Sequence, residues 1–171
     1  MKALVVIAPE RYRDEELDEP LALFRERGIS YDIASTKKGT CGGMLGGRTQ
    51  ATLTISEADP ASYGGIIIIG GAGAPAHLWG DRNLATLVTA FYTERKIVAA
   101  ICLAPVILAH TGILKGRNAT VFRSPDAVAE MKKGGAILSN RAVVEDDNVI
   151  TANGPAAASA FAQAVISAFG M

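Results

Sequence analysis

Cys102 is the residue whose position most suggests chemistry. It ends a strand-length apolar run, Ile97 to Cys102, and Pro105 then predicts a helix that extends to about Thr111. Such a strand-to-helix elbow exposes its side chain at the sheet edge, and the helix N-terminus favours thiolate over thiol. The pattern predicts a reactive sulfur. Local sequence leaves a second interpretation open, because cysteine is also among the most buried residue types and fills small core niches.

A glycine-rich segment, Gly70 to Ala74, follows the apolar run Ile66 to Ile69. Glycines at a strand end let the backbone approach a ligand closely, and their N–H groups can receive an oxyanion. The segment lacks the full dinucleotide-binding spacing and the acidic residue after a second strand, so it gives little support to a nucleotide cofactor. The alternative interpretation is a tight structural turn.

An acidic run comes directly after the first predicted strand. Most of these carboxylates are expected at a solvated helix N-terminus. One of them, directed back across the strand ends towards Cys102, would be buried with a raised pKa and could exchange a proton with the thiol or with substrate. The run alone does not select which one. Its members are Asp14, Glu15, Glu16, Asp18 and Glu19.

Histidine is scarce, with only His77 and His110 in the chain. His110 falls near the end of the helix that follows the elbow, where a capping role at the helix C-terminus is expected. His77 lies just beyond the glycine segment and is a candidate substrate contact. These residues do not supply a metal-ligand cluster, so we predict no metal site.

The elements around these residues alternate between strand and helix. The central strands are continuous β-branched apolar runs, as in parallel sheets covered on both faces. The alternation predicts an α/β, three-layer, mainly parallel, doubly wound sheet, in which sites form beyond the carboxyl ends of the strands. The predicted order is strand Lys2–Ala8, helix Asp14–Arg27, strand Ile29–Ser35, strand Gly65–Gly70, helix Asp81–Arg95 and strand Ile97–Cys102.

The remaining segments complete the sheet and its cover. The glycine-punctuated stretch 40–55 predicts an excursion or hairpin at a sheet edge. A strand is expected near Thr120, followed by a helix that has proline in its first turn. The later elements are helix Pro125–Lys133, strands Arg141–Glu145 and Asn148–Ala152, and a terminal helix Pro155–Phe169.

Length and composition limit the number of domains and the class of protein that the chain can represent. The 171 residues are 49% hydrophobic and 20% charged, which predicts one domain, 1–171, with its own core. Lys plus Arg and Asp plus Glu both total 17, without a basic cluster, so nucleic acid is not an expected partner. Cys41 and Cys102, without a secretory signal, are expected to be free thiols in the cytoplasm. The apolar stretch 97–114 contains Pro105 and His110 and divides into strand, turn and helix, so we expect no membrane span.

Several motifs together resemble the ThiJ/PfpI superfamily, which includes DJ-1, bacterial glyoxalase III and deglycase proteins, and archaeal intracellular proteases. The resemblance extends essentially from end to end and implies a flavodoxin-like sandwich, a homodimer or larger homo-oligomer, and no organic cofactor. The motifs are MKALVVIAP at the N-terminus, E-L-x-x-P at Glu16, Leu17 and Pro20, IIIIGGAGA, AAICLAP, GG-x-x-L-S-N-R-x-V-V-x-D-x-x-V-I-T, and a helix after NGP.

The resemblance also implies roles for individual residues. The nucleophile of the family matches Cys102, and its elbow-facing glutamate matches Glu16, which selects Glu16 from the acidic run. Backbone donors of the oxyanion type fall at Gly71 and Leu103, and Gly70 supports the loop.

Both histidines that the superfamily uses are absent. The members described as proteases place His directly after the cysteine, where this chain has Leu103. The DJ-1-like branch places His at the start of the helix after the following strand, where the matching stretch 121–125 reads VFRSP. Arg123 and Ser124 are candidate substrate contacts there, but neither can act as an imidazole base.

These residues predict thiol chemistry on small reactive carbonyls. Cys102 would add to an aldehyde such as methylglyoxal or to its early protein adduct, Glu16 would move protons, and lactate or a similar acid would be released. The alternative is a redox-sensing stress protein or chaperone in which Cys102 is oxidised to a sulfinate. An intracellular cysteine peptidase ranks last, because Leu103 replaces the expected His.

Overall fold

A seven-stranded sheet forms the middle of the computed structural model, which describes every residue from Met1 to Met171. All neighbouring strands pair in parallel except β11 and β12, which form an antiparallel hairpin at one edge. In spatial order the strands are β11 (Val143–Asp146), β12 (Val149–Ala152), β8 (Ile97–Ile101), β7 (Gly65–Ile68), β1 (Lys2–Val6), β3 (Ser30–Ser35) and β6 (Leu53–Thr54). The predicted doubly wound, mainly parallel sheet is confirmed.

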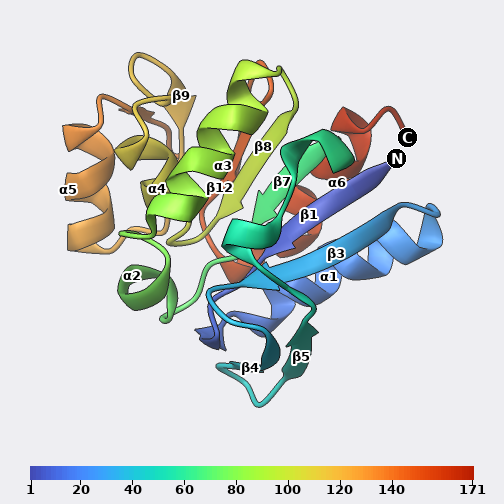
Figure 1. Cartoon of the computed structure of the whole chain (residues 1–171). Coiled ribbons are helices and arrows are strands. Elements are labelled where there is room, and N and C mark those ends of the chain that lie inside the picture. The colour runs from blue at the N-terminus through green and yellow to red at the C-terminus, as the bar shows by residue number, and fades with distance from the viewer.

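Helices cover both faces of this sheet (Figure 1). The apolar side chains of α1 (Asp14–Glu26) and α6 (Ala158–Ala168) belong to one core cluster, and those of α3 (Arg82–Thr93) and α4 (Pro105–His110) belong to the other. Helix α5 (Pro125–Lys133) packs outside α4. The central strands β1, β7 and β8 separate the two clusters, which is why their sequences are almost continuously apolar rather than alternating.

Local signals explain several of the boundaries. The Asp81 carboxylate accepts the Leu84 N–H at 2.8 Å and caps α3. The Ser124 hydroxyl accepts the Ala127 N–H at 3.2 Å, and the predicted helix Pro125–Lys133 is confirmed at both ends. Gly28 follows α1 with φ +66°, a conformation in which glycine carries no steric penalty.

The predicted excursion over residues 40–55 is confirmed as a hairpin beside the main sheet. Strands β4 (Gly39–Gly43) and β5 (Arg48–Ala51) pair antiparallel, and β2 (Glu10–Tyr12) joins β4 to make a separate three-stranded sheet. The chain then returns through β6 to the edge of the main sheet. Figure 1 shows the hairpin extending beyond β3.

The strand expected near Thr120 is present as β9 (Asn118–Ala119), which pairs with β10 (Ile137–Leu138) outside the central sheet. The predicted start of the terminal helix was wrong. The terminal helix begins at Ala158, because residues Pro155–Ala157 form a separate 3-10 turn after Gly154. The other short elements are α2 (Ala74–His77) and the 3-10 turns Ile55–Glu57 and Pro60–Ser62. No helix combines the length and apolar character that a membrane span requires.

Candidate active site

Cys102 occupies a sharp elbow at the carboxyl end of β8. Its φ of +64° is rare for any residue other than glycine, and two backbone hydrogen bonds hold it there. The Cys102 N–H donates to the Ala152 carbonyl at 2.9 Å, and the Cys102 carbonyl accepts the Phe122 N–H at 2.8 Å. The side chain is only 5% exposed. The elbow is therefore confirmed, and its sulfur is also largely buried.

Glu16 brings a carboxyl from the first turn of α1 to the same place. Its side chain is fully buried, and its Oε2 accepts the Gly70 N–H at 2.9 Å. A Cβ placed on Gly70 would lie 2.6 Å from Cys102 Cβ and 2.9 Å from Glu16 Oε2, so the cysteine and the carboxyl flank the same small space. The Oε1 atom has no hydrogen-bond partner of ordinary geometry. Of the five acids in the run, Glu16 is the one that faces Cys102.

The two side chains shift each other's protonation. Burial raises the pKa of Glu16 to about 7, and interaction with the Cys102 thiol and the Gly70 N–H opposes part of that rise. Burial together with the Glu16 carboxylate raises the pKa of Cys102 to about 12, although backbone N–H groups at Gly71 and Leu103 oppose the rise. The N–H at the helix N-terminus does favour thiolate, but loss of hydration and a nearby negative charge outweigh the backbone donors, so the net pKa of the thiol is raised.

A small cavity of about 190 Å³ opens beside the thiol. Six segments of the chain contribute its walls. The lining residues are Arg13, Met44, Gly71, Ala72, Cys102, Leu103, Phe122 and Pro155. Its volume is below the 300–1,000 Å³ usual for drug-sized ligands, so it fits a small molecule or one extended side chain.

The family model of the DJ-1/PfpI family matches residues 1–168. The chain belongs to the DJ-1/PfpI family. It is 49% identical over 98% of its length to an uncharacterized protein of Methanocaldococcus jannaschii, of which the match covers 82%. It is 32% identical to the deglycase PfpI of Pyrococcus furiosus, with 91% of each chain covered. A crystal structure of a ThiJ/PfpI domain protein from Brachyspira murdochii superposes with a TM-score of 0.94 at 32% identity, covering 99% of this chain and 96% of that one.

The backbone donors that the family resemblance indicated lie at the sulfur in this DJ-1/PfpI protein. The N–H groups of Gly71 and Leu103 stabilise the ionised form of Cys102, and both residues line the cavity. Gly71 has φ +111°, and a Cβ there would lie 2.5 Å from the Arg13 nitrogen, so this position requires glycine. The Gly70 N–H donates to Glu16 Oε2, which ties the loop to α1.

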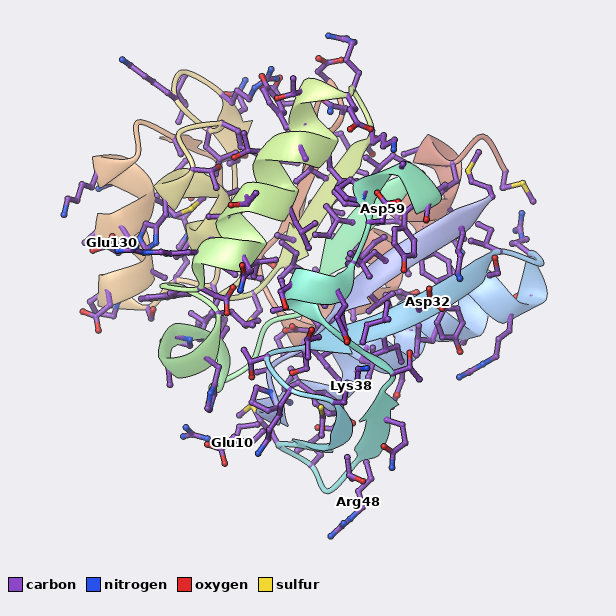
Figure 2. All side chains as sticks on the ribbon, in the orientation of Figure 1. Glu10, Asp32, Lys38, Arg48, Asp59 and Glu130 are labelled. Carbon is purple, nitrogen blue, oxygen red and sulfur yellow. The ribbon has the colours of Figure 1, made fainter.

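The three predicted substrate contacts are engaged elsewhere, and none of them lines the cavity. His77 Nε2 lies 3.0 Å from Glu10 Oε1, and Figure 2 shows Glu10 at the outer edge of the molecule. Arg123 donates to the Ser139 carbonyl and to Asn140 Oδ1. Ser124 caps α5. The stretch VFRSP instead contributes Phe122, directly before the two polar residues that sequence reasoning selected.

His110 does not cap its own helix through its side chain, contrary to expectation. Its Nδ1 lies 3.1 Å from the Trp79 carbonyl, and its Nε2 lies 2.7 Å from Glu130 Oε2 on α5 (labelled in Figure 2). The Trp79 indole N–H donates to the Leu103 carbonyl at 2.8 Å. This network connects α5 and α4 to the elbow peptide, and no local sequence signal pointed to it.

Sequence reasoning also missed four lining residues: Arg13, Met44, Phe122 and Pro155. They come from the end of β2, the hairpin tip, the segment after β9 and the turn before α6. The only available signal was the large apolar side chains of Met44 and Phe122 in glycine-rich or polar stretches. No group of three or more His, Cys, Asp or Glu side chains is arranged to hold a metal ion.

Proposed function

We propose that the chain is a cysteine-dependent enzyme of the glyoxalase or deglycase type that acts on small reactive carbonyls such as methylglyoxal. The observation that carries this proposal is the buried Glu16 carboxyl against Cys102, with backbone donors at the sulfur and a small cavity above it. The relative from Pyrococcus furiosus and a second relative from Pyrococcus horikoshii, 31% identical, are both named deglycases.

The first step would be addition of the thiol to the aldehyde carbon. Cys102 forms the C–S bond while its proton passes to ionised Glu16, whose pKa near 7 suits a proton acceptor at neutral pH. The carbonyl oxygen gains negative charge, which the N–H groups of Gly71 and Leu103 are placed to stabilise before that oxygen is protonated. Thiol addition therefore needs no imidazole, so the proposed chemistry requires neither family histidine.

The later steps return the proton and add water. With methylglyoxal, Glu16 would move the former aldehyde hydrogen to the neighbouring carbon as a proton, so that the first carbon is oxidised to a thioester while the second is reduced to an alcohol. Water then cleaves the thioester, releasing lactate and the free thiol. The net change is addition of one water molecule, with no external oxidant or reductant.

Turnover of methylglyoxal by the wild type and by Cys102→Ser tests this function. We expect the wild type to form lactate and the variant to lose turnover by at least a thousandfold. Cys41→Ser is the matched control, since Cys41 is a buried free thiol in β4 that lies outside the cavity. Retained turnover in Cys102→Ser, or absence of turnover in a folded wild type, would contradict the proposal.

A second candidate function, redox sensing, is favoured by the unpartnered Oε1 of Glu16. Two equivalents of peroxide would convert the Cys102 thiol to a sulfinic acid and release two water molecules, and a sulfinyl oxygen could share a proton with this carboxyl. Mass spectrometry after mild peroxide should then find two added oxygens at Cys102 and none at Cys41. Equal oxidation of both thiols counts against this function.

We further propose assembly into a homodimer or larger homo-oligomer, which only the family resemblance supports. Light scattering coupled to gel filtration should give at least twice the 17.8 kDa chain mass. A monomer at all concentrations examined would contradict assembly without affecting the proposed chemistry.

A further inference from the structure

We propose that the cavity beside Cys102 selects carbonyl compounds that carry an apolar substituent, and that Met44 and Phe122 determine this specificity. The inference rests on the proposed function and names the substrate class within it. Apart from Cys102 itself, Arg13 is the only cavity-lining residue with a polar side chain. Arg13 donates to Glu15 from Nε at 2.8 Å and from Nη2 at 3.0 Å, so the Nε–Nη2 edge of its guanidinium is already engaged.

Phe122 forms one wall of the cavity, and a backbone hydrogen bond holds it beside Cys102. Its N–H donates to the Cys102 carbonyl, which fixes its backbone against the elbow. A Cβ added to Gly154 would lie 3.2 Å from Phe122 Cδ2, so the ring rests over this glycine next to Pro155. The side chain is nevertheless 44% exposed. A large aromatic left partly in water at the mouth of a cavity can bury further area against a ligand.

Met44 provides a second wall from the tip of the β4–β5 hairpin and is 41% exposed. Its N–H donates to the Tyr12 carbonyl at 2.8 Å, and its Sδ accepts the Ala72 N–H at 3.3 Å. The thioether of Met44 therefore contacts the loop that contains Gly71. Met44 comes from outside the main sheet, yet two contacts tie it to the site.

Asp14 holds this hairpin tip in place. Its nearly buried carboxylate accepts the Leu45 N–H at Oδ2 and the Gly47 N–H at Oδ1, both at 2.8 Å. A Cβ on Gly43 would overlap this carboxylate, so the hairpin closes around Asp14 only because position 43 is glycine. A fixed tip makes Met44 a preformed wall, and Asp14 is its positioning residue.

The physical basis of selection is the apolar surface that Met44 and Phe122 present to the substituent. A hydroxyl or a charge placed against these two side chains would lose water without gaining a hydrogen bond from them. An apolar group would lose water favourably against the thioether and the aromatic ring. Since the reacting atoms are the same in a series of oxoaldehydes, differences in kcat/KM report the burial of the substituent.

The test compares methylglyoxal with isopropylglyoxal and hydroxypyruvaldehyde. We expect the wild type to show kcat/KM about tenfold or more higher for isopropylglyoxal than for methylglyoxal, and a lower value for hydroxypyruvaldehyde. Met44→Ala and Phe122→Ala should each reduce the isopropyl-to-methyl ratio several-fold, whereas Met44→Leu should retain it. Ile137→Ala, a change at an exposed apolar residue on β10 outside the cavity, should leave activity and ratio unchanged.

A measurement that needs no turnover keeps the inference separate from the proposed function. Reversible addition of isobutyraldehyde should protect Cys102 from iodoacetamide at lower concentration than glycolaldehyde does, and Met44→Ala should reduce the difference. Equal protection by both aldehydes, or better protection by glycolaldehyde, overturns the apolar specificity whether or not the enzyme turns over. If Cys102→Ser loses turnover while the wild type shows an isopropyl-to-methyl ratio of kcat/KM near one, the proposed function is supported and only this inference is overturned.

Discussion

The Glu16 carboxyl and the Cys102 thiol are buried against each other, and each alters the protonation of the other. The ionised carboxylate raises the pKa of the thiol, and the thiol lowers the pKa of a carboxyl that burial has raised. Near neutral pH the thiol is therefore protonated, while Glu16 is divided between acid and carboxylate. We therefore expect nucleophilic reactivity at this site to depend on proton transfer from sulfur to Glu16 rather than on a stable thiolate.

The pH dependence of Cys102 alkylation should report Glu16. Iodoacetamide should react faster as pH rises through about 7, because ionised Glu16 can accept the thiol proton during attack. In Glu16→Gln this rise in the alkylation rate near pH 7 should disappear, and the rate at pH 8 should fall by at least tenfold. Stopped-flow or mass-spectrometric rates between pH 5 and 9 provide the measurement.

Glu15→Gln is the matched control for alkylation. Glu15 is the neighbouring acid in the same helical turn, but its carboxylate bonds to Arg13 and it does not line the cavity. Its removal should leave the rise in alkylation rate near pH 7 in place. If that rise persists in Glu16→Gln, another group controls the protonation of the thiol.

The stability of the fold should also depend on Glu16. Its folded pKa lies above the usual value of 4.5, so the stability that it contributes is fully present below about pH 4.5 and is lost as pH rises through about 7. The difference in unfolding free energy between wild type and Glu16→Gln should shift in favour of the variant by about 3 kcal/mol between pH 4 and 9. Urea melts across this range measure it, and a constant difference would contradict the buried, raised-pKa carboxyl.

Gly70→Ala should disturb the pair sterically. The new Cβ would lie 2.5 Å from the Ile101 carbonyl oxygen and closer than 3.0 Å to both Cys102 and Glu16, so neighbouring atoms must move. We expect a loss of about 1–3 kcal/mol in unfolding free energy and slower alkylation of Cys102. Gly80→Ala is the control, because nothing lies within 4 Å of its Cβ position. Equal stabilities of the two variants would refute the close packing at Gly70.

Trp79→Phe should loosen the elbow peptide. It removes the indole N–H that bonds the Leu103 carbonyl, at a cost of about 1 kcal/mol, and should slow alkylation of Cys102 by several-fold. Tyr63→Phe is a matched loss of an aromatic hydrogen-bond donor, here to Asp32 far from the elbow. It should lower the melting temperature while leaving the alkylation rate unchanged. A Trp79 variant that reacts like wild type would limit this network to a packing role.

Most of the secondary structure could be predicted because its signals are local. Continuous β-branched runs gave β1, β7 and β8, and proline in the first turn gave α4 and α5 within one residue of their ends. The sequence did not predict short strands that depend on a partner. Strand β10 has only two residues and pairs with β9, so its position depends on contacts between residues that are distant in the sequence.

For the site, the sequence by itself determined the elbow at Cys102, the glycine loop and, through family resemblance, the choice of Glu16. Those features depend on residue type and on short spacing along the chain. The tertiary structure decided that the thiol is protonated at rest, because burial and the Glu16 charge act between residues from different elements. It also decided the apolar character of the cavity, because a hairpin tip and the segment after β9 bring Met44 and Phe122 to the thiol.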